Sequence, residues 1–433
     1  MSQQYSPSPR YPLTLSSSSR LRYFSCFYLY IMQGIPAGFS LTALTGYLTA
    51  RGADPVVVGS FIAVAGIPWT FQFIWGPVID RFQYSTMGHR KHWLVLTQLL
   101  AFLASLSLLF IHEPLTEVVA LGAVFFFHSL FASIQDATAD AMIIDIVPVP
   151  ERGRANAFMR GGFLTGFALG SAGLSTMLHL FGFGFAAALQ SVCLLLFTAL
   201  TFFIRLRPGD QLLPVSGPRV NRLSLPSQPA LATVFRRIRD GIFEPHRLSY
   251  FLLVALVYCC FSVFIRAFSF SLIREYRWSD QSLSVLQGGW GVLLMLVVVL
   301  IGGRLADRVG AFRLQQRVLL VTGLFLLLFC GLSAWWHNRS VATIGLISWS
   351  FADPLFSVCC FPILMGLCEK PVEGSQFTTY MAVINLCDVA GSYLTGWLMR
   401  VAHAGSIGLG CGMVIIITLI LFVRLNRKKQ LVL

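Results

Sequence analysis

Two carboxylates four positions apart inside an apolar run are the residues of this chain best suited to chemistry. Asp136 and Asp140 lie within residues 117–147, which are otherwise mostly hydrophobic. Residues i and i+4 share one face of a helix, so the two carboxylates would be neighbours. A carboxyl group that is buried beside another can take up and release a proton. The alternative is ion pairing with arginines near the adjacent helix ends, namely Arg81, Arg90, Arg152 and Arg154.

Four more polar residues occur in apolar runs, where a charged side chain is costly. Arg266 can hold a carboxylate or phenolate of a solute with its planar guanidinium, or it can form a structural ion pair. Asp353 and Asp388 can carry protons, pair with Arg266 or contact a solute. Gln33 can contact a solute or link two helices.

The rest of the chain supplies the apolar segments that must position these groups. Of the 433 residues, 56% are hydrophobic and 12% are charged, and the mean hydropathy is +0.73. No soluble domain could bury so much apolar surface, so the composition predicts a protein embedded in the lipid bilayer. The net charge of +14 does not indicate nucleic acid as a partner, because the basic residues lie in the short connections between apolar runs.

Apolar runs long enough to cross a bilayer occur twelve times. The first run is too long for the core of a signal peptide, and we interpret it as a retained helix. The runs cover residues 23–50, 55–79, 92–112, 117–147, 155–179, 183–205, 248–273, 281–303, 314–336, 340–365, 375–400 and 405–424.

The order of these runs predicts an all-α integral membrane protein with twelve transmembrane helices in two pseudo-symmetric six-helix bundles. A polar, proline-rich connection separates six runs from six. The predicted parts are a cytoplasmic N-terminal tail, the first bundle, a cytoplasmic linker, the second bundle and a basic cytoplasmic tail, at residues 1–22, 23–205, 206–247, 248–425 and 426–433.

The distribution of basic residues predicts the orientation of the chain. Of the 32 Lys and Arg residues, five lie in the connections on one side, Arg266 lies within a run, and 26 lie on the other side. The positive-inside rule therefore places both termini in the cytoplasm. We predict a multi-pass protein of the bacterial inner membrane.

A short pattern occurs in both halves, after the second and the eighth runs. Asp80-Arg81 follows a Trp-Gly-Pro turn, and Asp307-Arg308 follows a Gly-Gly pair, so the two acids stand 227 residues apart. The basic segment 88–91 comes after the first copy. A small-residue turn with an acid and bases at matching helix ends indicates a duplicated six-helix carrier.

Motifs for enzymes and cofactors are missing from the sequence. It has no P-loop glycine pattern, no Ser-His-Asp spacing and no redox Cys pair. Of its ten cysteines, nine lie in apolar runs and Cys368 follows one, all without metal-type spacing, and His128, His179 and His403 are scattered. We therefore predict no enzymatic activity, no cofactor and no metal. Energy would come from an ion gradient or from the gradient of the solute itself.

These features resemble the major facilitator superfamily over about residues 23–425. Residues 151–154, Glu-Arg-Gly-Arg, are similar to the acid-arginine-glycine signature of that superfamily, although the segment before 88–91 carries an insertion. The resemblance implies two halves that rock around a central site. It also implies conformational locking by gate residues, which we assign to Asp80, Arg81, Arg90, Arg152, Arg154, Asp307 and Arg308.

Within the superfamily, residues 33–36, 66–77 and 133–141 resemble the AmpG-type muropeptide permease branch, and residues 376–378 are similar too. The Gln-Asp motif of that branch corresponds to the segment that contains Asp136 and Asp140. The branch also holds single-protein siderophore permeases of the RhtX/FptX kind, associated with pyochelin, rhizobactin and yersiniabactin. The end of the chain at Leu433, soon after the twelfth run, favours the siderophore permeases.

The resemblance thus predicts a secondary active transporter with a small-molecule solute and a proton as its partners. Our prediction is proton-coupled import of an iron-siderophore or a similar amphiphilic metallophore. The alternatives are import of muropeptides, export of a siderophore or drug, and a membrane signal transducer that does not transport.

Overall fold

The structure is a computed structural model of the whole chain. It describes residues 14–82, 85–148, 151–213, 236, 239–240, 243–292, 294–295, 298, 308–367 and 373–428. Most of the predicted linker and the predicted gate residue Asp307 lie outside the described residues. The same holds for the side chains of Asp80, Arg81, Arg152 and Arg154.

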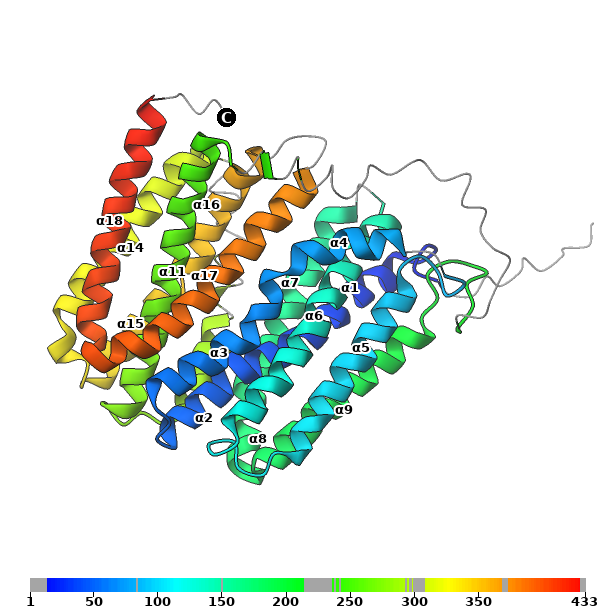
Figure 1. Cartoon of the computed structure of the whole chain (residues 1–433), viewed down its shortest axis with the longest axis horizontal. Helices are drawn as coiled ribbons and strands as arrows, with labels where there is room; N and C mark the ends of the chain where they lie inside the picture. The colour runs from blue at the N-terminus through cyan, green and yellow to red at the C-terminus, as the bar shows by residue number, and fades with distance from the viewer. Residues whose placement is uncertain are drawn as a thin grey trace, which may run out of the picture.

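The regular elements of the described residues are helices (Figure 1). Those of the N-terminal half are α1 (Ser19–Gly38), η1 (Phe39–Leu44), α2 (Thr45–Ala50), α3 (Pro55–Thr70), α4 (Gln72–Arg81), α5 (Lys91–Leu106), η2 (Ser107–Phe110), α6 (Val118–Ile146), α7 (Arg152–Ala168), η4 (Leu169–Gly173), α8 (Leu174–Phe181) and α9 (Phe183–Phe203). Those of the C-terminal half are α11 (Pro245–Arg274), α12 (Asp280–Val285), η6 (Leu286–Gly291), α14 (Ala311–Gly331), η7 (Ser333–Trp335), α15 (Arg339–Trp349), α16 (Ala352–Gly366), α17 (Glu373–Val401) and α18 (Ala404–Lys428).

Each of the twelve predicted spans coincides with one helix or with consecutive helices, and the named helices of the eighth reach Gly291. Among the described residues, nine helices are long and apolar enough to cross a membrane. The segment from α1 to α2 and the helix α17 are equally long but carry more polar residues. The predicted all-α membrane fold is therefore confirmed.

Several crossings are interrupted, which the sequence analysis did not predict. Phe71 separates α3 from α4, and residues 350–351 separate α15 from α16. Three crossings contain a short π-helical segment, namely η1, η4 and η6. Such segments bend a helix and turn its side chains, and they often occur at functional sites.

Small residues let the helices of the N-terminal half pack closely. Gly162, Gly166 and Gly170 follow one another along α7 and η4 and face α1. A Cβ at Gly166 would lie 2.2 Å from the carbonyl oxygen of Ile31, so only glycine allows this approach. Backbone contact of this kind is a common way for membrane helices to associate.

The hydrophobic core of the C-terminal half contains many buried aromatic residues. Phe264 and Phe268 on α11 are fully buried, and their ring centroids lie 4.7 Å from those of Trp349 and Trp336 respectively. Aromatic pairs at such distances stabilise a core beyond the effect of their buried area. This packing fixes the face of α11 on which Arg266 lies.

The two halves meet along α3 and α17, which pack side by side between them (Figure 1). A Cβ at Gly59 would lie 2.5 Å from the carbonyl oxygen of Ser392, and one at Gly396 would lie 2.7 Å from the Cα of Val56. The first residues of α3 and the last turns of α17 thus touch through their backbones. The halves are in contact at the end of the molecule that the basic residues assign to the outside.

Candidate proton and solute site

The predicted carboxylate pair lies at the centre of a polar cluster in the N-terminal half. The hydroxyl of Tyr30 on α1 donates a hydrogen bond to Asp140. The Nε2 of Gln72, the first residue after the break between α3 and α4, donates to Oδ2 of Asp136 at 2.5 Å. Gln33 lies beside Asp136, and its side chain is buried. Three crossings therefore contribute to this cluster.

The cluster is enclosed by protein yet reachable by water. Asp136, Asp140 and Tyr30 are each surrounded by neighbouring atoms, but their side chains are only half-buried. Residues that are both enclosed and accessible line an internal, water-accessible space. A carboxylate pair in that position can exchange protons with water without facing lipid.

A second polar cluster occupies the facing part of the C-terminal half. Nη2 of Arg266 on α11 lies 2.9 Å from Oδ2 of Asp388 on α17, and Nη1 donates to the hydroxyl of Ser262 at 3.0 Å. Nε of Arg266 is buried and has no hydrogen-bond partner among the described residues. The side chain of Asp388 is 48% exposed, so one face of this ion pair remains available to a solute.

Asp353 stands at the beginning of α16, directly after the break at residues 350–351. The hydroxyl of Ser357 donates to its Oδ1 at 2.8 Å, and that hydroxyl also lies 2.9 Å from the hydroxyl of Tyr258. Asp353 is enclosed by protein and nevertheless exposed to water. Arg266, Asp388 and Asp353 thus combine both signs of charge on one side of the interior.

Two of the predicted gating residues have described side chains. Arg90 starts α5 in a left-handed conformation, with φ of 62°, and donates a hydrogen bond to Asp145 near the end of α6. Arg308 is exposed. Arg90 therefore ties the basic segment 88–91 to the helix that carries the carboxylate pair.

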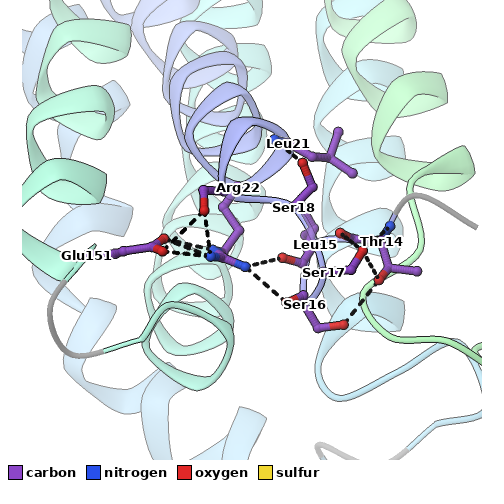
Figure 2. Close-up of polar contacts among 9 residues, drawn as sticks. Thr14, Leu15, Ser16, Ser17, Ser18, Leu21, Arg22 and Glu151 are labelled. Carbon is purple, nitrogen blue, oxygen red and sulfur yellow. Dashed lines mark hydrogen bonds and ion pairs between the residues drawn. The ribbon is translucent and has the colours of Figure 1, made fainter. Parts of the chain in front are cut away.

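Glu151, the acid of the segment 151–154, forms an ion pair with Arg22 near the beginning of α1 (Figure 2). Nη2 of Arg22 lies 2.8 Å from Oε2 of Glu151, and Nη1 of Arg22 donates to the carbonyl oxygen of Leu15 at 2.9 Å. The hydrogen bonds and the charge of Arg22 hold the pKa of Glu151 below its usual range. Glu151 therefore remains ionised near neutral pH and fixes the beginning of α1 to the beginning of α7.

At the opposite end, two polar contacts join the halves. Nη2 of Arg400 lies 3.0 Å from Oδ2 of Asp54, the residue that caps α3. Nε2 of His179 lies 2.9 Å from Oδ2 of Asp280 at the start of α12. Partial burial acts against the ionised form of Asp54, but the hydrogen bonds from Arg400 and from the backbone of Val56 outweigh it, and the pKa of Asp54 is lowered. The Asp54–Arg400 pair therefore persists through neutral and mildly acidic pH.

The π-helical segments lie at this same junction. η4 packs against both η1 and η6, so the fifth crossing touches the first and the eighth through their irregular turns. A Cβ at Gly288 would lie 1.3 Å from Oγ and 2.4 Å from Cβ of Ser171. The halves thus meet closely at Gly288, where η6 has no side chain to keep η4 at a distance.

Sequence reasoning found the charged residues of both clusters and missed most of their partners. Tyr30 gave no signal, because a tyrosine in an apolar run is usually a packing residue. His179 looks isolated in the sequence, but the fold brings it to Asp280, 101 positions away. Among the described residues, no group of three or more potential ligands could hold a metal ion.

Crossing helices in two halves, with polar clusters enclosed between them, define a membrane transporter. Residues 26–392 match the family model described as Major Facilitator Superfamily. The chain therefore belongs to this superfamily, and it is a multi-pass secondary transporter.

Proteins of similar sequence indicate which members of the superfamily this chain resembles. The chain is 25% identical to the anhydromuropeptide permease of Escherichia coli (strain K12) over 382 residues, which are 86% of this chain and 73% of the permease. It is 22% identical to the putative transporter AmpG 4 of Rickettsia conorii over 389 residues, 88% of this chain and 90% of that protein. The predicted resemblance to AmpG-like transporters is confirmed at this level.

Solved structures agree with the fold. The nucleoside transporter NupG superposes with a TM-score of 0.69 at 12% identity, covering 94% of this chain and 99% of that one. A D-xylose-proton symporter superposes with a TM-score of 0.63 at 14% identity, covering 90% of this chain and 97% of that one. At such low identities, the superpositions show the fold alone.

The ion pair between Arg266 and Asp388 can be tested by a double-mutant cycle. We expect Arg266→Gln to lower the stability by about 1–2 kcal/mol, between the values for surface and buried pairs, because Asp388 loses its partner. Asp388→Asn in the same chain should restore most of the loss. Thermal unfolding of the purified protein in detergent measures both effects. Ser262→Ala, which keeps the ion pair, is the control, and additive losses in the double variant would contradict the pairing.

The contact between Gly288 and Ser171 gives a second prediction. Gly288→Ala should separate η6 from η4 at a cost of about 1–3 kcal/mol, since the new methyl group overlaps Ser171. Hydrogen–deuterium exchange of residues 169–173 and 286–291 should then accelerate. Ser171→Gly in the same chain makes room for the methyl group and should restore slow exchange. Gly289→Ala is the matched control, because its Cβ would have no atom nearer than 4.0 Å. Equal exchange in the two alanine variants would disprove the role of this contact.

Proposed function

We propose that this protein imports anhydromuropeptides, or closely similar peptidoglycan fragments, across the bacterial inner membrane together with protons. The observation that carries the proposal is the enclosed carboxylate pair Asp136–Asp140, which faces an interior with charges of both signs. The relatives named above add the substrate class, because one of them is called an anhydromuropeptide permease. Import of an iron-siderophore, our expectation from the sequence, has no comparable support.

The carboxylate pair supplies the proton site of this proposal. Two carboxylates on one helical face repel each other when both are ionised, so one proton shared between them is favourable. Tyr30 and Gln72 hold the two groups in place through hydrogen bonds. Water reaches them from inside the protein, and a change in access from one side of the membrane to the other would move the proton with it.

The C-terminal cluster supplies the contacts for the solute. The peptide of a muropeptide carries several carboxylates, and peptides that end in a diamino acid also carry an ammonium group. Arg266 can bind a carboxylate through its guanidinium. Asp388 and Asp353 can accept hydrogen bonds from an ammonium group. A solute with both groups would contact all three residues, whereas a neutral solute would offer them no charged partner.

The conformation fits a carrier that is open towards the cytoplasm. The contacts Asp54–Arg400 and His179–Asp280 join the halves at the end that carries few basic residues. Since that end is joined, water reaches Asp353 and Asp388 from the other end. The excess of basic residues at this other end assigns it, with both termini, to the cytoplasm.

The experiment for this proposal is uptake into cells that carry or lack the gene. The probe is a radiolabelled N-acetylglucosaminyl-1,6-anhydro-N-acetylmuramyl tripeptide, with a ferric siderophore labelled with radioactive iron as a parallel probe. Gene-dependent uptake of the muropeptide that stops with a protonophore would support the proposal. Gene-dependent uptake of the ferric siderophore alone would overturn it and restore the expectation from the sequence. Uptake of neither probe would also overturn it.

The carboxylate pair gives the third prediction. We expect Asp140→Asn to reduce uphill uptake of the muropeptide to the level of passive leak, because the proton site is lost. Exchange of labelled for unlabelled solute across proteoliposomes should continue, since exchange does not require the proton to leave. Asp140→Glu keeps a carboxyl group and should retain part of the uphill uptake. Asp240→Asn removes an exposed carboxylate outside the crossings and is the control. Equal loss of uptake and exchange in Asp140→Asn would show that Asp140 binds the solute or supports the structure instead.

A further inference from the structure

Arg160 on α7 is exposed, but it lies on a different face of the helix from three other exposed residues. Phe158, Thr165 and Leu169 are exposed along one face of α7 and η4. At 100° per residue, Arg160 lies about 200° around the helix from Phe158, on the opposite face. Its side chain is nevertheless exposed. Arg160 therefore points into the water-accessible interior and away from lipid.

The groups around Arg160 belong to both halves of the protein. Its positive charge acts on Asp136, Asp140 and Tyr30 in the N-terminal half. The same charge acts on Asp353 in the C-terminal half. Arg160 is thus within electrostatic range of the carboxylate pair and of Asp353, one member of the cluster assigned above to the solute.

No described residue forms a hydrogen bond or an ion pair with Arg160. A guanidinium within a crossing, even near its end, is costly unless an anion or several acceptors compensate it. Its five N–H donors form a planar fork that matches a carboxylate. The guanidinium of Arg160 is thus available to bind an anion.

We propose that Arg160 binds a carboxylate of the transported solute, and that this contact couples solute binding to proton binding at Asp136 and Asp140. The inference rests on the proposed function and deepens it, because it restricts the solute to compounds with a free carboxylate near their polar end. A solute anion on Arg160 adds negative charge beside the carboxylate pair and engages the charge that compensates it. Proton binding and solute binding then strengthen each other, as linkage requires. Such reciprocal coupling is what a symporter needs.

The test measures binding of two forms of one probe to the purified, full-length protein in nanodiscs. The first form is the labelled anhydromuropeptide tripeptide with free carboxylates, and the second is the same compound with its carboxyl groups converted to amides. Wild-type protein should bind the free acid at least about tenfold more tightly, the lower end for charge-assisted hydrogen bonds. Arg160→Gln should weaken binding of the free acid to the level of the amide and leave binding of the amide unchanged. Arg160→Lys keeps the charge without the fork and should fall between the two.

Arg424→Gln, at an exposed position near the cytoplasmic end of α18, is the matched control and should behave as wild type. If Arg160→Gln keeps the preference for the free acid, the proposal is wrong. If both forms bind more weakly by the same factor, Arg160 supports the structure and the proposal is again wrong.

If wild-type protein binds neither form, the proposed function fails first, and a measurement without solute then tests the coupling. The pH dependence of thermal unfolding is compared for Arg160→Gln, Asp140→Asn and the double variant. Non-additive changes would support a direct coupling between Arg160 and the carboxylate pair. Additive changes would overturn it.

Discussion

The cost of charge inside a membrane determines how this protein is built. A carboxylate or guanidinium in hydrocarbon needs a partner of opposite charge, hydrogen-bond donors or water. The structure meets this need separately in its two halves. Asp136 and Asp140 have Tyr30 and Gln72, whereas Arg266 has Asp388. Because each cluster is compensated within its own half, the halves can move relative to each other without exposing an unpaired charge to lipid.

The junction between the halves depends mainly on the packing of small residues. Where α3 meets α17 and where η4 meets η6, glycines bring backbone or small side chains into direct contact. Of the polar contacts there, Asp54–Arg400 is exposed and water weakens it, whereas Asp280 in the contact with His179 is buried. Close packing of small residues and these two polar contacts therefore hold this end together.

The sequence was sufficient to predict the crossings, because a run of about twenty apolar residues has few alternatives to a membrane helix. It also identified Asp136, Asp140, Arg266, Asp353 and Asp388, since charge in such runs is rare. It did not reveal the break at Phe71 or the π-helical segments, which depend on how neighbouring helices pack. Nor did it pair Tyr30 with Asp140 or His179 with Asp280, because those contacts join distant parts of the chain. The preference for a siderophore rested on the position of Leu433, which says nothing about the chemistry of a binding site.

The contacts of the N-terminal segment have a consequence for biogenesis. The backbone N–H of Leu15 donates to the carbonyl oxygen of Arg205, and that of Ser16 donates to Leu206 (3.1 and 2.9 Å). These acceptors follow the sixth crossing, so the ribosome makes them long after Leu15 has emerged. The first helix therefore enters the membrane before Leu15 and Ser16, which precede it, have these partners. Only when the sixth crossing is complete can the two hydrogen bonds form, and they then join the segment before the first crossing to the segment after the sixth.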